Sequence, residues 1–521
     1  MATTYLTQGM HRAAAQFPAR IASVFGGRRR SYGELVDRVS RLAGALRQFG
    51  LAPGDRVGVL SLNSDRYLEL YFAVWWAGGV INPVNTRWSP REIAHSLDDC
   101  KTSLLVVDPM FAGCAEELSQ RAHSLRTVIC ASDSEPPSGM YSYEQLILEN
   151  QPVADAMRSN EDLAGIFYTG GTTGVAKGVM LTHRNLWSVA AGSIESIAPA
   201  GLNALHSAPM FHMADGMFTI AQVMRGNTQV ILPAFDPAAV LKVIAQEQVG
   251  IALLVPTMIQ MIIDHPDAAS ADLDALRRIV YGASPISESL LDRAMARLPD
   301  VDFVQAYGLT EMAPLISFLG PDEHRGGSRS SGRLRSAGQP AWFVDVRILG
   351  SDGSEVPRGA VGEVVARGPG VMLGYWSKPA ETAAAIRDGW LHTGDGGYLD
   401  QDGFLFIVDR VKDMIVSGGE NVYSAEVENA IAQHQAVAAC AVIGIPDACW
   451  GEAVHAVIVC HPGSMAPSVD ELRLHCRELI AGYKCPRSVE VRLALPLSGA
   501  GKVLKTALRE PYWNDQLRLV S

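Results

Sequence analysis

The stretch YTGGTTGVAKGVMLTH, residues 168–183, has the composition of a phosphate-binding loop. Glycine backbones can turn several amide N–H groups into one concavity, and hydroxyls with one ammonium group, here Lys177, add donors around phosphate oxygens. The stretch is not a Walker loop: that motif needs a glycine directly before its lysine, whereas Lys177 lies between Ala176 and Gly178. The pattern predicts a phosphate site. The alternative is a tight turn that binds no ligand. The choice between the two depends on other segments of the chain.

Two elements must position this loop. The apolar run 163–168 predicts a buried strand upstream, and residues 186–194 predict a helix downstream. A strand, a glycine-rich loop and a helix in this order are compatible with a phosphate site.

Strands alternate with helices on both sides of the loop, which predicts parallel sheets covered by helices on both faces. The stretch 31–49 predicts an amphipathic helix that begins with a Ser31/Glu34 capping box and closes at Gly50. Strand-like apolar runs lie at 57–62, 80–84, 104–108, 127–131, 228–232, 251–255 and 278–281.

The pattern of apolar residues and glycines changes after residue 337. Short β-like runs punctuated by glycine extend to about residue 406, which favours a small distorted β-barrel. After Arg410, helices at 424–434 and 468–480 and strands at 437–445 and 453–460 predict a separate α+β domain. The second of these helices begins with a Ser468/Glu471 capping box. The predicted fold class is therefore α/β, with two layered α/β sheets and a small β-barrel in a large N-terminal domain.

The totals exclude some classes of protein. With 521 residues and 56.0 kDa, the chain is long enough for more than one domain. A hydrophobic content of 48% argues against extended disorder, and a net charge of −11 argues against nucleic-acid binding. An acidic total still permits a local cationic pocket for ATP.

The N-terminus lacks the apolar core of a signal peptide, and no run of 18 apolar residues predicts a transmembrane segment, so we expect a cytoplasmic protein. The eight cysteines form no CxxC pair, so neither a zinc site nor a disulfide framework is predicted.

Five motifs in order resemble the adenylate-forming enzymes, and within them the acyl-CoA synthetases, over nearly the whole chain. They are the loop at 168–183, QAYGLTE at 305–311, HTGD at 392–395, VDRVKDMIVSGGENVYSAEVE at 408–428 and GKVLK at 501–505. The resemblance implies two half-reactions. A carboxylate and ATP give an acyl-adenylate and pyrophosphate, and the thiol of CoA then displaces AMP.

The resemblance also implies site residues. Glu311 matches the ligand of Mg²⁺, an oxygen donor that suits this hard cation. Thr310 matches a contact to the α-phosphate, and Lys502 matches the catalytic lysine that reaches the substrate carboxylate. The implied ATP- and AMP-binding residues are Thr169, Gly170, Gly171, Thr172, Thr173, Gly174, Lys177, Gln305, Ala306, Tyr307, Gly308, Asp395 and Arg410.

Family members rotate a C-terminal domain between the half-reactions, and the hinge falls at Lys412. The implied division is an N-terminal domain at 1–409, a hinge at 410–412 and a mobile C-terminal domain at 413–521. That rotation would bring Gly418, Gly419 and Glu420 near CoA.

His212 resembles the histidine at the entrance of the acyl pocket, where it would act with the catalytic residues. Met213, Met217 and Met312 are candidates for the pocket wall. Asp215 is unusual, because an acyl pocket seldom benefits from an unpaired charge; it is expected to face solvent or a polar substrate group.

Three positions depart from the commonest family pattern: Gly170 replaces Ser, Ala176 replaces Pro, and Ala500 replaces Thr or Ser. The GG form with VAKG resembles bacterial fatty-acid–CoA ligases, which favours a medium- or long-chain fatty acid substrate. An aryl- or cyclic-carboxylate–CoA ligase is one alternative, and an adenylation module that loads a carrier protein is another. A silent nucleotide-binding relative is disfavoured by Glu311, Asp395 and Lys502. A homodimer is a candidate assembly.

Overall fold

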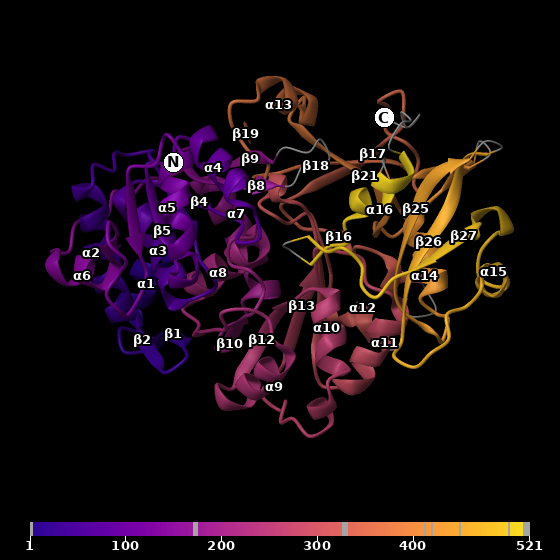
Figure 1. The fold of residues 1–521 in the computed structure, drawn as a ribbon, viewed down its shortest axis with the longest axis horizontal. Coiled ribbons are helices and arrows are strands. Elements are labelled where there is room, and N and C mark those ends of the chain that lie inside the picture. Colours follow the sequence, from indigo (N-terminus) through magenta and orange to yellow (C-terminus); the bar gives the residue numbers. More distant parts are fainter. Residues whose placement is uncertain are drawn as a thin grey trace.

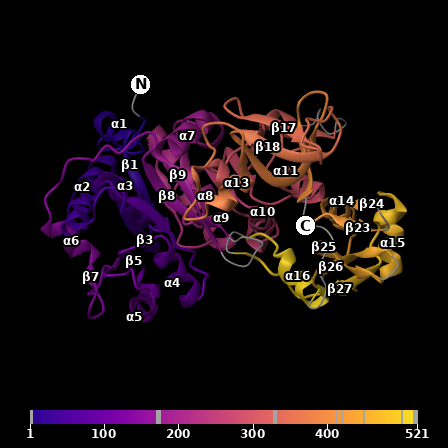
Figure 2. The ribbon, with the colours of Figure 1, turned by 90° about the horizontal axis from the view of Figure 1, so that it is seen from above.

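The computed structural model describes residues 4–169, 176–325, 332–410, 413–417, 420–447, 450–498 and 501–513. Within these ranges the chain forms four β-sheets with helices packed around them (Figures 1 and 2). Two large sheets are mainly parallel, as the alternation of strands and helices predicts.

The first large sheet has eight strands in the order β19-β9-β8-β4-β3-β5-β6-β7. Its β8, β4, β3, β5, β6 and β7 run parallel, and β9 and β19 are antiparallel additions at one edge. The bounds are β3 (Arg56–Leu60), β4 (Val80–Pro83), β5 (Leu104–Val107), β6 (Thr127–Cys130), β7 (Tyr141–Ser142), β8 (Leu163–Thr169), β9 (Lys177–Thr182) and β19 (Gly374–Tyr375).

The second large sheet has nine strands in the order β16-β15-β14-β13-β12-β10-β11-β1-β2. Its central strands from β14 to β1 are parallel, and the outer strands are antiparallel. The bounds are β1 (Ile21–Phe25), β2 (Arg28–Ser31), β10 (Asn203–His206), β11 (Gln229–Ile231), β12 (Val249–Leu254), β13 (Arg278–Gly282), β14 (Asp302–Tyr307), β15 (Ser317–Leu319) and β16 (Gln339–Pro340).

Two smaller sheets come later in the sequence. The antiparallel five-stranded sheet corresponds to the predicted β-barrel and contains β17 (Asp345–Leu349), β18 (Gly362–Arg367), β20 (Ile386–Arg387), β21 (Trp390–Leu399) and β22 (Leu405–Arg410). The C-terminal sheet contains β23 (Ile415–Ser417), β24 (Glu420–Val422), β25 (Val437–Asp447), β26 (Gly451–Cys460) and β27 (Ser488–Val491). Both views show the C-terminal sheet at the opposite end of the molecule from β5 and α2. The predicted hinge at 410–412 lies between these two sheets in the sequence and stays a prediction.

Helices surround these sheets, and the predicted helix starts are confirmed. Ser31 and Glu34 form the capping box of α2, and Ser468 and Glu471 form that of α15. The α-helices are α1 (Gln8–Gln16), α2 (Tyr32–Gln48), α3 (Asp65–Ala77), α4 (Pro90–Asp99), α5 (Ala112–Arg121), α6 (Tyr143–Glu149), α7 (His183–Ile197), α8 (Met213–Arg225), α9 (Pro237–Gln246), α10 (Pro256–Ile263), α11 (Glu288–Arg297), α12 (Pro321–His324), α13 (Pro379–Ala385), α14 (Ser424–Ile431), α15 (Val469–Arg477) and α16 (Lys505–Trp513). Short 3₁₀ turns are η1 (Pro109–Phe111), η2 (Pro266–Ala269), η3 (Thr310–Met312), η5 (Arg333–Arg335) and η6 (Gly482–Lys484).

The helix predicted at 186–194 is confirmed within α7, but a strand that was not predicted precedes it. The loop joins β8 to β9, which pair antiparallel from Thr169↔Lys177 to Leu163↔Thr182, and α7 begins only at His183. Val179 and Leu181 are both fully buried and lie two positions apart, so in a strand their side chains point to the same face. The first described element after the loop is therefore a strand and not a helix N-terminus.

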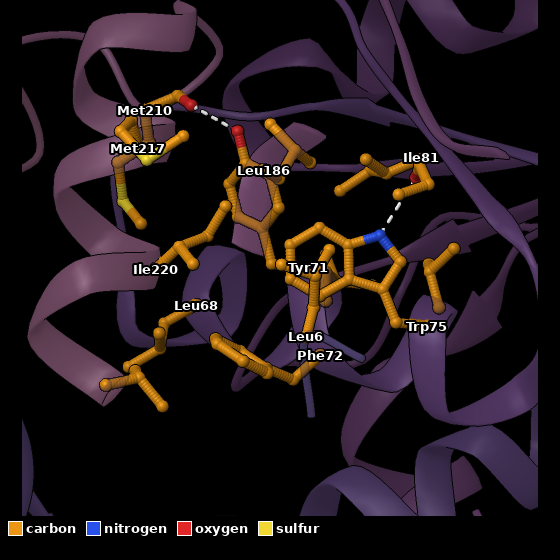
Figure 3. Packing of buried hydrophobic residues seen from close by; sticks show 14 of the residues in the cluster. Leu6, Leu68, Tyr71, Phe72, Trp75, Ile81, Leu186, Met210, Met217 and Ile220 are labelled. Atoms are coloured by element: carbon orange, nitrogen blue, oxygen red, sulfur yellow. Dashed lines mark hydrogen bonds between the residues drawn. The ribbon is translucent and has the colours of Figure 1, made fainter. Parts of the chain in front are cut away.

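The largest hydrophobic cluster contains residues from both large sheets and from α3, α7 and α8. Figure 3 shows its centre, where the Tyr71 hydroxyl donates to the Met210 carbonyl at 2.8 Å. The Trp75 indole is fully buried and donates to the Ala164 carbonyl at 2.8 Å. Truncation of Trp75 to alanine is expected to cost about 3–5 kcal/mol of stability. Helix α8, which begins beside His212, is thus held by the core.

No helix among the described residues is long and apolar enough to cross a membrane. The seven described cysteines are free thiols.

Candidate active site

The QAYGLTE motif lies at the C-terminal end of β14, the edge where parallel strands place ligand-binding groups. Gln305 and Ala306 are strand residues, and Tyr307 is the last residue of β14. The amide oxygen Oε1 of Gln305 is buried and has no hydrogen-bond partner within the described residues. A β-carbon on Gly308 would lie 2.0 Å from the Pro314 carbonyl oxygen, so only glycine fits there.

Thr310 and Glu311 come next, in the η3 turn. Thr310 is buried, whereas Glu311 is only half-buried. The hydroxyl of Tyr375 donates to Oε1 of Glu311 at 2.9 Å, and the Met372 amide donates to the Glu311 carbonyl at 2.9 Å. Glu311 is thereby oriented from β19, a strand of the other large sheet.

Sequence reasoning missed Tyr375. Burial first, and then the charge of Glu311, raise the pKa of the Tyr375 phenol, so it stays protonated and donates. Nζ of Lys177 lies 5.0 Å from the centre of the same ring, within cation–π distance. Tyr375 therefore joins the lysine of the glycine-rich loop to the predicted metal ligand. In the sequence, Gly374 and Tyr375 follow an apolar run, a pattern that indicates a turn but no chemical role for Tyr375.

The structure also joins Tyr307 to Asp395. The Tyr307 hydroxyl donates to Oδ2 of Asp395 at 2.7 Å, although the two residues are 88 positions apart. Asp395 lies on β21, is 8% exposed, and pairs in register with Arg410 on β22. Tyr307 and Asp395, both implied to bind the nucleotide, are therefore neighbours.

His212 precedes α8, and its Nδ1 accepts a hydrogen bond from the Ala214 amide at 3.4 Å. Burial first, and then the positive charge of Lys502, lower the pKa of His212 to about 4. The imidazole is thus neutral near pH 7. The charge of Lys502 therefore acts on His212 although 290 residues separate them in the sequence.

The loop that contains Lys502 lies against the N-terminal part of the chain. A hairpin forms through the bridge Leu497↔Val503, and the Ser498 amide donates to the Lys502 carbonyl at 2.7 Å. Arg87 donates to the Ser498 carbonyl at 2.8 Å. A β-carbon on Gly501 would lie 3.3 Å from a methyl group of Val255.

Met213, Met217 and Met312 are all buried in the same hydrophobic cluster, at most 1% exposed. Asp215 is fully buried as well, and its Oδ1 lies 2.7 Å from Nδ1 of His206. The expectation that Asp215 faces solvent is therefore wrong, because a histidine of β10 supplies a buried partner. His206 was not singled out in the sequence, since nothing there places it beside α8.

The remaining predicted residues lie at strand ends or outside the described ranges. Thr169 ends β8 and pairs with Lys177, and Glu420 begins β24. The predicted residues outside the described ranges are Gly170, Gly171, Thr172, Thr173, Gly174, Lys412, Gly418 and Gly419.

The described residues contain no group of three or more His, Cys, Asp or Glu side chains that could hold a metal ion by themselves. A Mg²⁺ ion that is bound mainly by phosphate oxygens needs few protein ligands. The half-buried carboxylate of Glu311, oriented by Tyr375, fits such a role.

Comparison with known proteins identifies the family of the chain. The model of the AMP-binding enzyme family matches residues 10–376, and that of the AMP-binding enzyme C-terminal domain matches residues 426–502. The chain belongs to the AMP-binding enzyme family. It is an AMP-forming acid–CoA ligase, and ATP and CoA are the co-substrates of such ligases.

Within this family, the chain is 41% identical to a feruloyl-CoA synthase of Amycolatopsis sp over 506 residues, which cover 96% of this chain and 98% of the relative. It is 36% identical to the fatty acid–[acyl-carrier-protein] ligase ScoC of Streptomyces coeruleorubidus, over 97% of this chain and 96% of the relative. Among solved structures, the amide bond synthetase McbA of Marinactinospora thermotolerans superposes with a TM-score of 0.88 at 30% identity, covering 97% of this chain and all of that one.

Proposed function

We propose that this AMP-binding enzyme activates an aromatic carboxylic acid with Mg·ATP, forms an acyl-adenylate with release of pyrophosphate, and transfers the acyl group to CoA. The observation that supports this mechanism best is the position of Lys502. Its charge lowers the pKa of His212, and its hairpin is bound by Arg87. These contacts support a role for Lys502 in adenylation, in which the ammonium group must reach the acid and the α-phosphate together.

In the first half-reaction the substrate carboxylate attacks the α-phosphate, and no protein nucleophile is needed. Lys502 would hold the two anions in line and stabilise the charge that develops on their oxygens. Neutral His212 would border the acid without adding a second positive charge. Thr310 would donate to the α-phosphate, and Lys177 with the glycine-rich loop would bind the other phosphates.

The nucleoside would lie between β14 and β21. Asp395 can accept hydrogen bonds from the ribose hydroxyls while Tyr307 holds its Oδ2. The unpartnered Oε1 of Gln305 could accept the adenine amino group. Glu311 would hold Mg²⁺, which when bound neutralises phosphate charge.

The second half-reaction would use the division predicted from the sequence, with 1–409 fixed, 410–412 as the hinge and 413–521 rotating about Lys412. Lys502 would leave the adenylate, and Gly418, Gly419 and Glu420 would approach CoA. Cytoplasmic location and a homodimer remain parts of the proposal.

The aromatic acid is preferred because the feruloyl-CoA synthase is the more similar of the two relatives compared above. A medium- or long-chain fatty acid is the second candidate. The buried methionines Met213, Met217 and Met312 favour it, since flexible thioether side chains adapt to an alkyl chain. Transfer to a carrier protein is the alternative acceptor, by similarity to ScoC.

The test is AMP release from ATP across a panel of acids: short, medium and long alkyl acids, benzoates and cinnamates, each with and without CoA. Preference for ring-bearing acids with CoA supports the proposal. Preference for an alkyl chain moves the assignment to fatty acids. AMP release that needs acyl-carrier protein and not CoA contradicts the proposed acceptor.

A further inference from the structure

The HTGD motif lies in a bulge of β21, beside its neighbour β18 in the small antiparallel sheet (Figure 1). The pairing of the two strands passes from Glu363↔Gly396 to Val365↔His392. Between these pairs β18 advances by two residues and β21 by four, so residues 393–395 leave the regular ladder. The bulge therefore contains the carboxylate that is predicted to bind ribose.

The Thr393 side chain makes one set of contacts inside the bulge. Its hydroxyl donates to the Val364 carbonyl at 2.7 Å and accepts from the Asp395 amide at 3.1 Å. A side chain of the bulge thus forms hydrogen bonds where the ladder between the strands is interrupted.

Glu363 contacts the same bulge with both of its carboxylate oxygens. Oε1 accepts from the Gly394 amide at 3.2 Å, and Oε2 lies 2.8 Å from Nδ1 of His392. Because a carboxylate accepts, the ring nitrogen is the donor of this second bond. Glu363 therefore binds the residues on both sides of Thr393.

The backbone conformation explains why such support matters. Gly394 has a φ of +71°, in the left-handed region that favours glycine, so its own conformational preference does not fix the chain. The two successive peptide groups before Asp395 are instead held by side chains. Glu363 accepts from the first amide, and Thr393 accepts from the second.

The Glu363–His392 pair is partly open to solvent. The Glu363 side chain is 30% exposed and that of His392 is 12% exposed. An ion pair with such exposure contributes little to stability, so removal of Glu363 should leave the protein folded. Its hydrogen bonds still hold the backbone that carries Asp395, whose Oδ2 is oriented by Tyr307.

We propose that Glu363 is a positioning residue for nucleotide recognition, which holds the bulge of β21 so that Asp395 binds the ribose of ATP. The inference rests on the proposed function, in which Asp395 accepts hydrogen bonds from the ribose hydroxyls. Glu363 acts through the Gly394 amide and does not touch the nucleotide. A displaced Asp395 loses the contacts to the hydroxyls, so the protein then distinguishes ribose from deoxyribose less well.

The experiment measures the binding of ATP, 2′-deoxy-ATP and 3′-deoxy-ATP by calorimetry. The unaltered protein should prefer ATP roughly 10- to 100-fold over at least one deoxynucleotide, because a site built to accept a hydroxyl rejects the analogue that lacks it. Glu363→Ala should reduce this preference about 3- to 10-fold. The preference is a ratio of affinities, so a smaller folded fraction of the variant does not change it.

Three further variants test the route through Asp395. Glu363→Gln keeps an acceptor oxygen for the Gly394 amide and should retain most of the preference. Asp395→Ala should abolish the preference, and Glu363→Ala added to it should have no further effect. Glu355→Ala is the matched control, since Glu355 is an exposed carboxylate that lies 3.5 Å from Arg347 of β17; it should leave the preference unchanged.

An unchanged preference in Glu363→Ala would overturn the inference. So would an equal loss of affinity for all three nucleotides, because that result indicates a purely structural role. Equal binding of the three nucleotides by the unaltered protein would overturn the ribose contact of Asp395 and the inference with it. Failure of the proposed ligase reaction is detected separately, as a lack of AMP release with every acid of the panel. Nucleotide binding needs no acid and still decides the role of Glu363 in that case.

Discussion

The carboxylates in the two halves of the candidate site have different hydrogen-bond partners. On the adenylate side, Glu311 and Asp395 each accept a hydrogen bond from a tyrosine, Tyr375 and Tyr307 respectively. On the acyl side, Asp215 is paired with His206 and both are fully buried. A tyrosine that donates one hydrogen bond can orient a carboxylate for a ligand, whereas the fully buried His206 holds Asp215 inside the core. We therefore expect Glu311 and Asp395 to act at the nucleotide and the Asp215–His206 pair to hold α8 against β10.

The largest expected effect separates catalysis from binding. Lys502→Ala should lower acid-dependent ATP–pyrophosphate exchange by about 10²- to 10³-fold, because it removes the positive charge that stabilises the developing anions. ATP binding should persist. Lys484→Ala is the matched control, since that lysine is bound to Glu426 at 2.7 Å in the C-terminal domain. Normal exchange in Lys502→Ala would contradict the role of this lysine.

The variants Glu311→Gln and Asp215→Asn test this difference between the carboxylates directly. Glu311→Gln should raise the Mg²⁺ concentration for half-maximal activity about 10-fold or more, because a neutral amide is a weaker ligand for this hard cation. Asp215→Asn should leave the Mg²⁺ dependence unchanged. A Mg²⁺ titration of the initial rate measures the half-maximal concentration for both variants. An equal shift of that concentration in the two variants would contradict the different roles of Glu311 and Asp215.

The tyrosines should have smaller effects, since they act through the carboxylates. Tyr375→Phe and Tyr307→Phe each remove one hydrogen bond and leave the carboxylate in place, so we expect shifts of about 2- to 5-fold. Tyr375→Phe should shift the Mg²⁺ dependence in the same direction as Glu311→Gln, and Tyr307→Phe should raise KM for ATP. Unchanged values in steady-state kinetics would mean that neither tyrosine positions its carboxylate.

The sequence predicted the helix starts well because capping is local. Ser31 with Glu34 and Ser468 with Glu471 need only three residues of spacing. It missed β9, because a glycine-rich loop before an apolar run is compatible with either a hairpin or a helix. It also missed Tyr375 and His206, whose roles arise from partners on other strands; only the packing of the sheets places them.

The smallest effect concerns the pKa of His212, about 4, which burial and Lys502 lower. Removal of the ammonium charge in Lys502→Ala makes protonation easier, so the pKa should rise, yet remain below 6.5 because burial is the larger cause. Histidine ring signals in an NMR pH titration measure this, with His212→Gln to assign the signal. An unchanged pKa would mean that the Lys502 loop does not occupy this position in solution.

The most direct test of the central claim is ATP–pyrophosphate exchange in the absence of CoA, with the best acid from the substrate panel. Formation of a bound acyl-adenylate predicts exchange that requires the acid and Mg²⁺ and proceeds without CoA. Exchange that requires CoA, or that occurs equally without the acid, would contradict the two-step mechanism.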